Sequence, residues 1–222
     1  PEDTGNFAVM LDTIDFVENG DGSVNLVFPE SIPITFSGEG PEGETVKGVV
    51  SYTLQNMDMR ASGDPSKVSY VYSADQMKIA LQELTVAGDT IPMDALTAQF
   101  VSSAISGTSV MEPGALRKIA QDMAIGETSY QINFQDPEGS DAMVVNGESA
   151  SMTFNGETMI PADMDPENMG EALKNGFAIN GGYGYSGSTT EFSFSDGGDT
   201  MGGSSGASSA QINVQLSKDS LE

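Results

Sequence analysis

The chain has 222 residues, of which 33 are Asp or Glu and 8 are Lys or Arg, so its formal charge is −25. It contains no histidine and no cysteine. This excludes the side chain that titrates near neutral pH, thiolate metal ligands and every Cys- or His-based nucleophile. A field this negative repels phosphate backbones and anionic headgroups, so we expect neither nucleic-acid binding nor adsorption to an anionic membrane.

Apolar and polar residues alternate with a period of two over many short segments, which is typical of strands with one packed face. In chain order, the apolar positions of these segments fall within residues 24–28, 32–36, 130–134, 150–154, 192–194 and 212–216. Pairs of Asn, Asp and Gly predict turns at 19–22, 146–147, 155–156 and 196–197. The pattern predicts a mainly β fold of roughly a dozen strands, in one large antiparallel sheet that is curved or sandwiched.

Two segments have helical patterns. Residues 166–174 follow Asp165, a suitable N-cap, and residues 112–124 place several apolar side chains on one side. Residues 94–105 fit either a helix or a strand. No break in composition marks a domain boundary, so residues 1–222 are interpreted as a single β-rich domain with one or two short helices.

Two glycine-rich segments match functional motifs in letters only. Residues 182–187 fit the dinucleotide pattern G-x-G-x-x-G, but the residues that follow them are strand-like, where that chemistry needs a helix. Residues 202–206 fit the nucleophile-elbow pattern G-x-S-x-G, but the chain has no histidine to serve as its base. Residues 197–209, rich in Gly and Ser, are predicted to form a long hairpin loop.

One cluster of oxygen ligands suggests a metal. Asp15, Asn19 and Asp21 gather around a predicted turn and are the kind of donor that Ca²⁺ prefers. The spacing does not fit an EF-hand, since Val17 and Leu26 occupy two of its ligand positions. A solvated acidic turn is the more common explanation for such a cluster. Calcium is the only cofactor that the sequence suggests.

Methionine is abundant, with 13 residues. Met57 and Met59 are expected to share one strand face, and Met77 to share another with Ile79 and Leu81. Met fills irregular cores and also lines adaptable hydrophobic binding surfaces. These five residues are therefore the candidate site for a hydrophobic ligand, with core filling as the alternative.

The last third of the chain resembles a known family. Residues 175–182 (NGFAINGG), the Tyr/Gly segment after them and residues 190–196 (TEFSFSD) are similar to bacterial exported proteins catalogued as domain of unknown function 2125. The resemblance implies an envelope protein made with a signal peptide. It implies no catalytic residues, and it implies that this chain is a piece of a longer one.

These observations lead us to expect a non-enzymatic protein of the periplasm or the cell exterior. The first hypothesis is that a lipid or other hydrophobic molecule binds the apolar face of a large sheet. The second is a structural module whose strand edges dock onto another protein or onto a second copy. The third hypothesis is a hydrolase built on paired carboxylates. The longest aliphatic runs, such as residues 7–11, are far too short to span a membrane.

Overall fold

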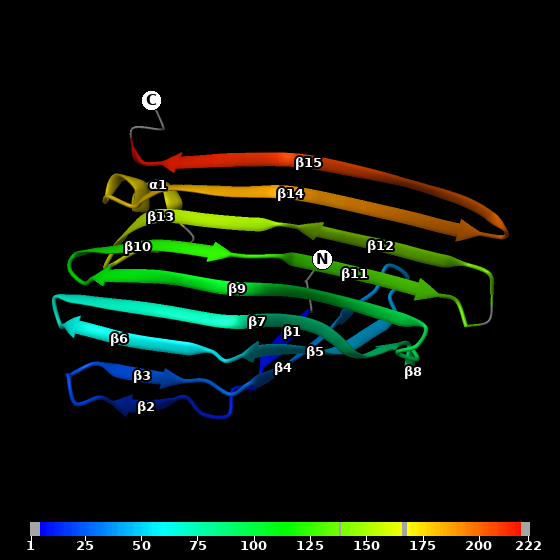
Figure 1. Cartoon of the computed structure of the whole chain (residues 1–222), viewed down its shortest axis with the longest axis horizontal. Coiled ribbons are helices and arrows are strands. Elements are labelled where there is room, and N and C mark those ends of the chain that lie inside the picture. Colours follow the sequence, from blue (N-terminus) through cyan, green and yellow to red (C-terminus); the bar gives the residue numbers. More distant parts are fainter. Residues whose placement is uncertain (1–4, 138, 166–167, 219–222) are drawn as a thin grey trace.

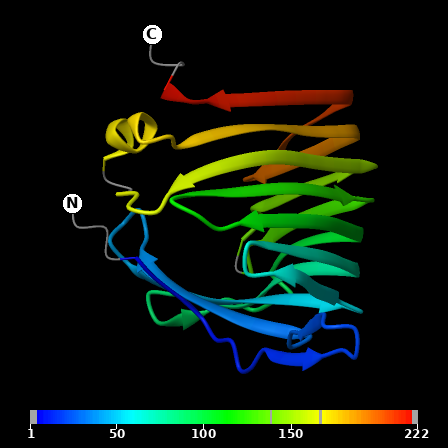
Figure 2. The ribbon, with the colours of Figure 1, turned by 90° about the vertical axis from the view of Figure 1, so that its left-hand side faces the viewer.

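The computed structural model describes residues 5–137, 139–165 and 168–218, and places 15 strands in one antiparallel sheet with a single short helix. The elements are β1 (Asn6–Val9), β2 (Asp15–Glu18), β3 (Val24–Val27), β4 (Ser31–Glu39), β5 (Thr45–Gln55), β6 (Asp58–Asp64), β7 (Lys67–Val86), β8 (Asp89–Thr90), β9 (Leu96–Glu112), β10 (Leu116–Ile125), β11 (Thr128–Gln135), β12 (Ala142–Ser149), β13 (Ser151–Pro161), α1 (Met169–Lys174), β14 (Ala178–Asp196) and β15 (Asp199–Leu216). The predicted mainly β fold is confirmed. Of the two predicted forms, the curved sheet is observed and the sandwich is not, because the strands lie in one layer (Figures 1 and 2).

The sheet is an up-and-down meander of long strands (Figure 1). Several of its positions hold two shorter strands end to end. For example, β10 pairs with the last part of β9 and β11 with its first part, while β13 and β12 pair with successive parts of β14. β15 forms one edge of the sheet, and β1 and β2 lie at the opposite edge.

The structure corrects the helix predicted at residues 112–124. Most of that segment is β10, which pairs with β9 on one side and β13 on the other. Residues 94–105, which fitted either a helix or a strand, contribute the start of β9. Local periodicity favours a helix at 112–124 and does not distinguish helix from strand at 94–105. In both segments, hydrogen bonding to neighbouring strands decides the outcome.

The other predicted helix is present in shorter form as α1. Its N-cap is Asn168, whose Oδ1 accepts a hydrogen bond from the Glu171 N–H at 3.3 Å, so the expectation of Asp165 as the cap is wrong. Residues 166–167 lie outside the described part of the chain. Leu173 is buried on the sheet, whereas Met169 is 39% exposed.

Two of the four predicted turns are confirmed. Residues 19–22 connect β2 to β3, and Gly197 with Gly198 connects β14 to β15. The Asn-Gly pairs at 146–147 and 155–156 lie inside β12 and β13, so the turns predicted there are wrong. The long loop predicted at 197–209 is also wrong, because β15 begins at Asp199 and pairs with β14 along its length.

The sheet has little covering. The buried apolar cluster consists of Ala172, Leu173 and Phe177 around α1, with Ile160, Met164, Ile179 and Leu216 packed against it. The chain exposes 14067 Å², whereas a compact monomer of 23.2 kDa exposes about 9,700 Å². The excess of roughly 4,400 Å² is as large as an extensive obligate interface. Within the described ranges, no helix has the length and apolar character needed to cross a bilayer.

Candidate functional site

One face of the sheet is formed by rows of apolar side chains that run across the strands. In the half of the sheet that holds β5 and β11, one row crosses from β4 to β11 and another from β11 to β15. Their register partners are Ile32, Tyr52, Ile79, Phe100 and Tyr130 in the first row, and Phe134, Met143, Phe194 and Met201 in the second.

The half of the sheet that holds β6 and β10 carries an equivalent row. Its register partners are Met59, Tyr72, Gly107, Met123, Phe154, Tyr183 and Ile212. Phe154 and Tyr183 are 38% and 39% exposed. Both halves of the sheet therefore present large apolar side chains to solvent.

Between the two halves of the sheet, the alternation of apolar and polar residues along the long strands is displaced by one residue. In β7, every second residue is apolar up to Tyr72 and Ala74, and the alternation resumes at Met77 and Ile79. One extra residue therefore lies between the two apolar series. Equivalent shifts occur near Ala104 in β9 and Gly187 in β14, which have φ of 49° and 59°. One residue in a bulge conformation returns the following apolar side chains to the same side of the sheet. We call the resulting continuous surface the apolar face.

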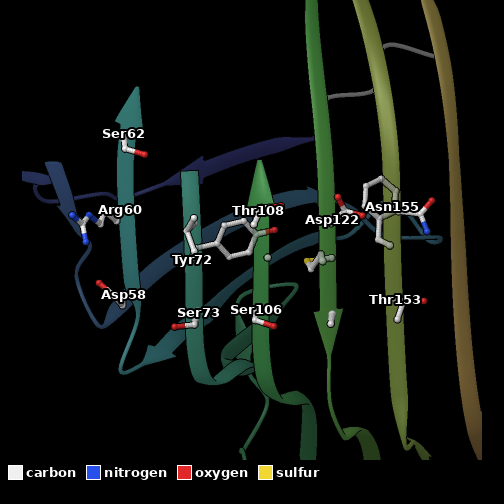
Figure 3. A pocket seen from close by; sticks show the side chains of 15 residues that line it. Asp58, Arg60, Ser62, Tyr72, Ser73, Ser106, Thr108, Asp122, Thr153 and Asn155 are labelled. Carbon is white, nitrogen blue, oxygen red and sulfur yellow. The ribbon is translucent and has the colours of Figure 1, made fainter. Parts of the chain in front are cut away.

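Aromatic rings lie across glycines of the neighbouring strand on the apolar face. In each of four register pairs, a Cβ added to the glycine would lie 3.0 Å or less from the partner's ring: Phe36 and Gly48, Tyr72 and Gly107, Tyr130 and Gly147, and Phe192 and Gly203. Figure 3 shows the Tyr72 ring reaching from β7 toward β9. In these four pairs the ring lies over backbone and fills the space that a side chain on the glycine would otherwise occupy.

In the central strands β7, β9, β11 and β12, charge is confined to the opposite face of the sheet. In β7, β9, β11 and β12, the positions of the apolar face hold no charged residue, while Lys78, Glu83 and Glu148 alternate with them and point the other way. Burial raises the pKa of the Tyr52 and Tyr72 hydroxyls, both of which belong to the apolar face. This face is therefore a low-polarity surface on a highly charged molecule.

The helix α1 covers only one end of the apolar face. It packs against Ile160, Ile179 and Leu216, which belong to β13, β14 and β15. In Figure 2, the N-terminal strands β1, β4 and β5 turn out of the plane of the other strands toward the side that carries α1. The sheet thus curves around the apolar face.

Four of the five predicted ligand residues lie on this face. Met77, Ile79 and Leu81 follow one another along β7, and Met59 faces Tyr72 from β6. Met57 lies in the connection between β5 and β6, so the expectation that it shares a strand face with Met59 is wrong. Sequence reasoning missed the aromatic–glycine pairs, whose only local signal is isolated glycines within strand patterns.

No family model, curated protein or solved structure matches this chain. The resemblance to the exported family therefore stays a prediction.

The opposite, polar face has an open depression of about 1030 Å³ across β6, β7, β9, β10 and β13. Figure 3 shows Thr108, Asp122 and Asn155 side by side in it. Its two carboxylates, Asp58 and Asp122, lie three strand positions apart, which is about 14 Å at the usual strand spacing. Glycosidases need their two carboxylates within about 5–9.5 Å, so this depression does not hold such a pair.

The predicted calcium ligands do not share one turn in the structure. Asp15 lies in β2 opposite Val27. Asp21 accepts hydrogen bonds from the Ser23 N–H and hydroxyl at 3.1 and 2.7 Å, and it forms an ion pair with Arg60.

The Asn19 amide donates to Ser23 Oγ at 3.0 Å and to Asn25 Oδ1 at 2.9 Å. Among the described residues, no group of three or more His, Cys, Asp or Glu side chains has metal-binding geometry. Calcium binding stays an untested prediction, and the hydrogen bonds give these polar groups a structural role in the turn.

Proposed function

We propose that the protein is a non-enzymatic binding protein of the bacterial envelope that holds a lipid or other hydrophobic ligand against its apolar face. The observation that carries this proposal is the breadth of that face, which extends over both halves of the sheet with only one end covered by α1. Surfaces of this kind on soluble proteins are usually occupied by a ligand or a partner.

The form of the face favours elongated, unbranched ligands. The apolar rows run across many strands, and at four positions an aromatic ring lies over a glycine of the neighbouring strand. Each methylene removed from water contributes about 0.8 kcal/mol, so a long acyl chain gains more than a small apolar molecule. Met59, Met77 and Met143 add flexible side chains that adapt to such a chain.

An exported location is part of the proposal. It is supported by the strongly acidic composition and the absence of cysteine, although salt-adapted proteins share the first of these features. The alternative function, an assembly module, is favoured by a different part of the molecule, the free edge of β15.

The first experiment is native mass spectrometry of protein purified from its own host, followed by solvent extraction and mass analysis of the bound material. A stoichiometric lipid supports the proposal. A protein that carries no apolar adduct and gains no Nile red fluorescence contradicts it.

A matched pair of variants locates the site. Ile79→Gln replaces a 36% exposed side chain on the apolar face, and Lys78→Gln places the same residue on the polar face of the same strand. We expect the first to weaken lipid or Nile red binding roughly fivefold to tenfold and the second to leave it unchanged. Equal effects from the two variants would place the ligand elsewhere.

A further inference from the structure

Among the described residues, no strand pairs with the long outer edge of β15. β15 runs over 18 residues, and within the described part of the chain its only partner is β14. About every second residue therefore directs its backbone N–H and C=O away from the sheet. Such an edge is a template for a further strand.

Apart from Asp199 at its start, this edge lacks the charges, prolines and short length that usually prevent strand addition. Residues 200–217 contain no charged residue and no proline, in a chain of net charge −25. The opposite edge is different, because β1 and β2 have four residues each and β2 carries Asp15 and Glu18. Short strands and charges protect an edge from pairing, so β15 is the edge open to association.

We propose that two copies of this chain associate through antiparallel pairing of their β15 strands about a two-fold axis near Ser208. The proposal is independent of ligand binding. A second copy is favoured over an unrelated strand because the two halves of β15 complement one another.

The complementarity is one of side-chain size. The first half of β15 carries Gly203 and Ser205 on the apolar face, and the second half carries Ile212 and Val214, which are 57% and 52% exposed. Antiparallel self-pairing about an axis between Ser208 and Ser209 places Gly203 opposite Val214 and Ser205 opposite Ile212, while the 65% exposed Met201 meets Leu216 at each end. The same size relationship already holds inside the sheet between Phe192 and Gly203.

The side of the sheet to which successive side chains of β15 point is also compatible with this arrangement. The apolar positions of β15 shift between Ala207 and Ala210, close to the middle of the strand, because Phe194 pairs with Met201 whereas Tyr183 pairs with Ile212. A two-fold axis at this shift keeps the apolar side chains of both copies on the same side of the joined sheet. The two apolar faces then form one continuous surface. An axis displaced from it by several residues would place apolar positions of one copy beside polar positions of the other.

The test is sedimentation velocity of the full chain near 100 μM, in which the proposal predicts a dimer. Ser208 lies beside the axis, so Ser208→Asp and Ser208→Lys each bring like charges together and should weaken association tenfold or more. An equimolar mixture of the two variants pairs opposite charges and should restore the dimer. Ser193→Asp, on the polar face of β14, is the matched control and should remain dimeric.

A monomeric wild-type chain at this concentration would overturn the proposal. Dimers that persist in both Ser208 variants, or a mixture that stays monomeric, would also overturn it. Open-ended oligomers would show instead that β15 pairs with the β1–β2 edge of the next copy. Circular dichroism of each variant verifies that the sheet is intact.

Discussion

The ring of Tyr72 occupies the space above Gly107, its register partner on the neighbouring strand, so that a Cβ on Gly107 would overlap the phenol. Burial against the sheet raises the pKa of the Tyr72 hydroxyl. The same relationship recurs at Phe36 and Gly48. These rings shield the backbone of a sheet whose described strands lie in one layer.

The first prediction concerns this pair. Gly107→Ala forces the Tyr72 ring to move and should lower the free energy of unfolding by about 1–3 kcal/mol, measured by urea denaturation. Gly38→Ala is the control, because its added Cβ meets nothing within 4 Å. In a Tyr72→Ala background the cost of Gly107→Ala should fall but not vanish, because the added Cβ also lies 2.7 Å from the backbone oxygen of Asp122. An unchanged cost would mean that the ring is not the obstacle.

The second prediction concerns a buried hydroxyl pair. Ser102 is fully buried and Thr128 nearly so, and their hydroxyl oxygens lie 3.1 Å apart on adjacent strands. Thr128→Val leaves the Ser102 hydroxyl without this partner and should cost about 1–3 kcal/mol of unfolding free energy, whereas Thr128→Ser retains it and should cost less. A smaller loss in the double variant Ser102→Ala/Thr128→Val than in Thr128→Val alone would show that the unpaired hydroxyl is the cause.

The third prediction concerns the bulge in β9. Ala104 has φ of 49°, a conformation that is strained for residues with a Cβ. Ala104→Gly should raise the free energy of unfolding by up to about 1 kcal/mol. Ala98→Gly, in the regular part of the same strand, should lower it by about 0.5–1 kcal/mol. Thermal unfolding compares the two, and a loss in both would contradict the bulge.

The fourth prediction concerns pH. The pKa of Asp21 is lowered from 3.8 to about 2, chiefly by hydrogen bonds from the Ser23 hydroxyl and N–H and to a lesser extent by Arg60. The folded-state pKa is depressed, so the stabilisation from this turn is fully present above about pH 4 and is lost as the pH falls through about 2. Carbon-13 NMR titration of the carboxyl group measures the pKa directly.

Two variants separate the causes of this shift. Ser23→Ala removes the largest contribution and should raise the Asp21 pKa more than Arg60→Gln does. The opposite order would show that charge, and not hydrogen bonding, dominates at this exposed turn.

Much of the sheet follows from local sequence. Alternation such as that of Tyr130, Ile132 and Phe134 predicts a strand with one apolar face, because successive side chains of a strand point to opposite sides whatever lies next to it. The apolar positions of Met77, Ile79 and Leu81 could be predicted in the same way. The displacement of the alternation between Ala74 and Met77 is also visible in the sequence, because one extra residue separates the two apolar series.

Other features depend on neighbours that are distant along the chain. Asn146-Gly147 has the composition of a hairpin turn, yet it lies within β12 because β11 and β14 pair with it on both sides. β10 has helical periodicity but is held as a strand by β9 and β13. In each case, the hydrogen bonds to two flanking strands outweigh a weak local preference.

The sequence by itself thus determined the strand-rich class, the separation of apolar from charged faces and the absence of histidine and cysteine chemistry. All three are set by composition and by the geometry of a single strand. Only the tertiary structure decided that the described strands lie in one layer, that aromatic rings lie over glycines such as Gly107, and that β14 is the only described strand that pairs with β15. These features depend on strand order and register, which are fixed by pairing between segments far apart in the chain.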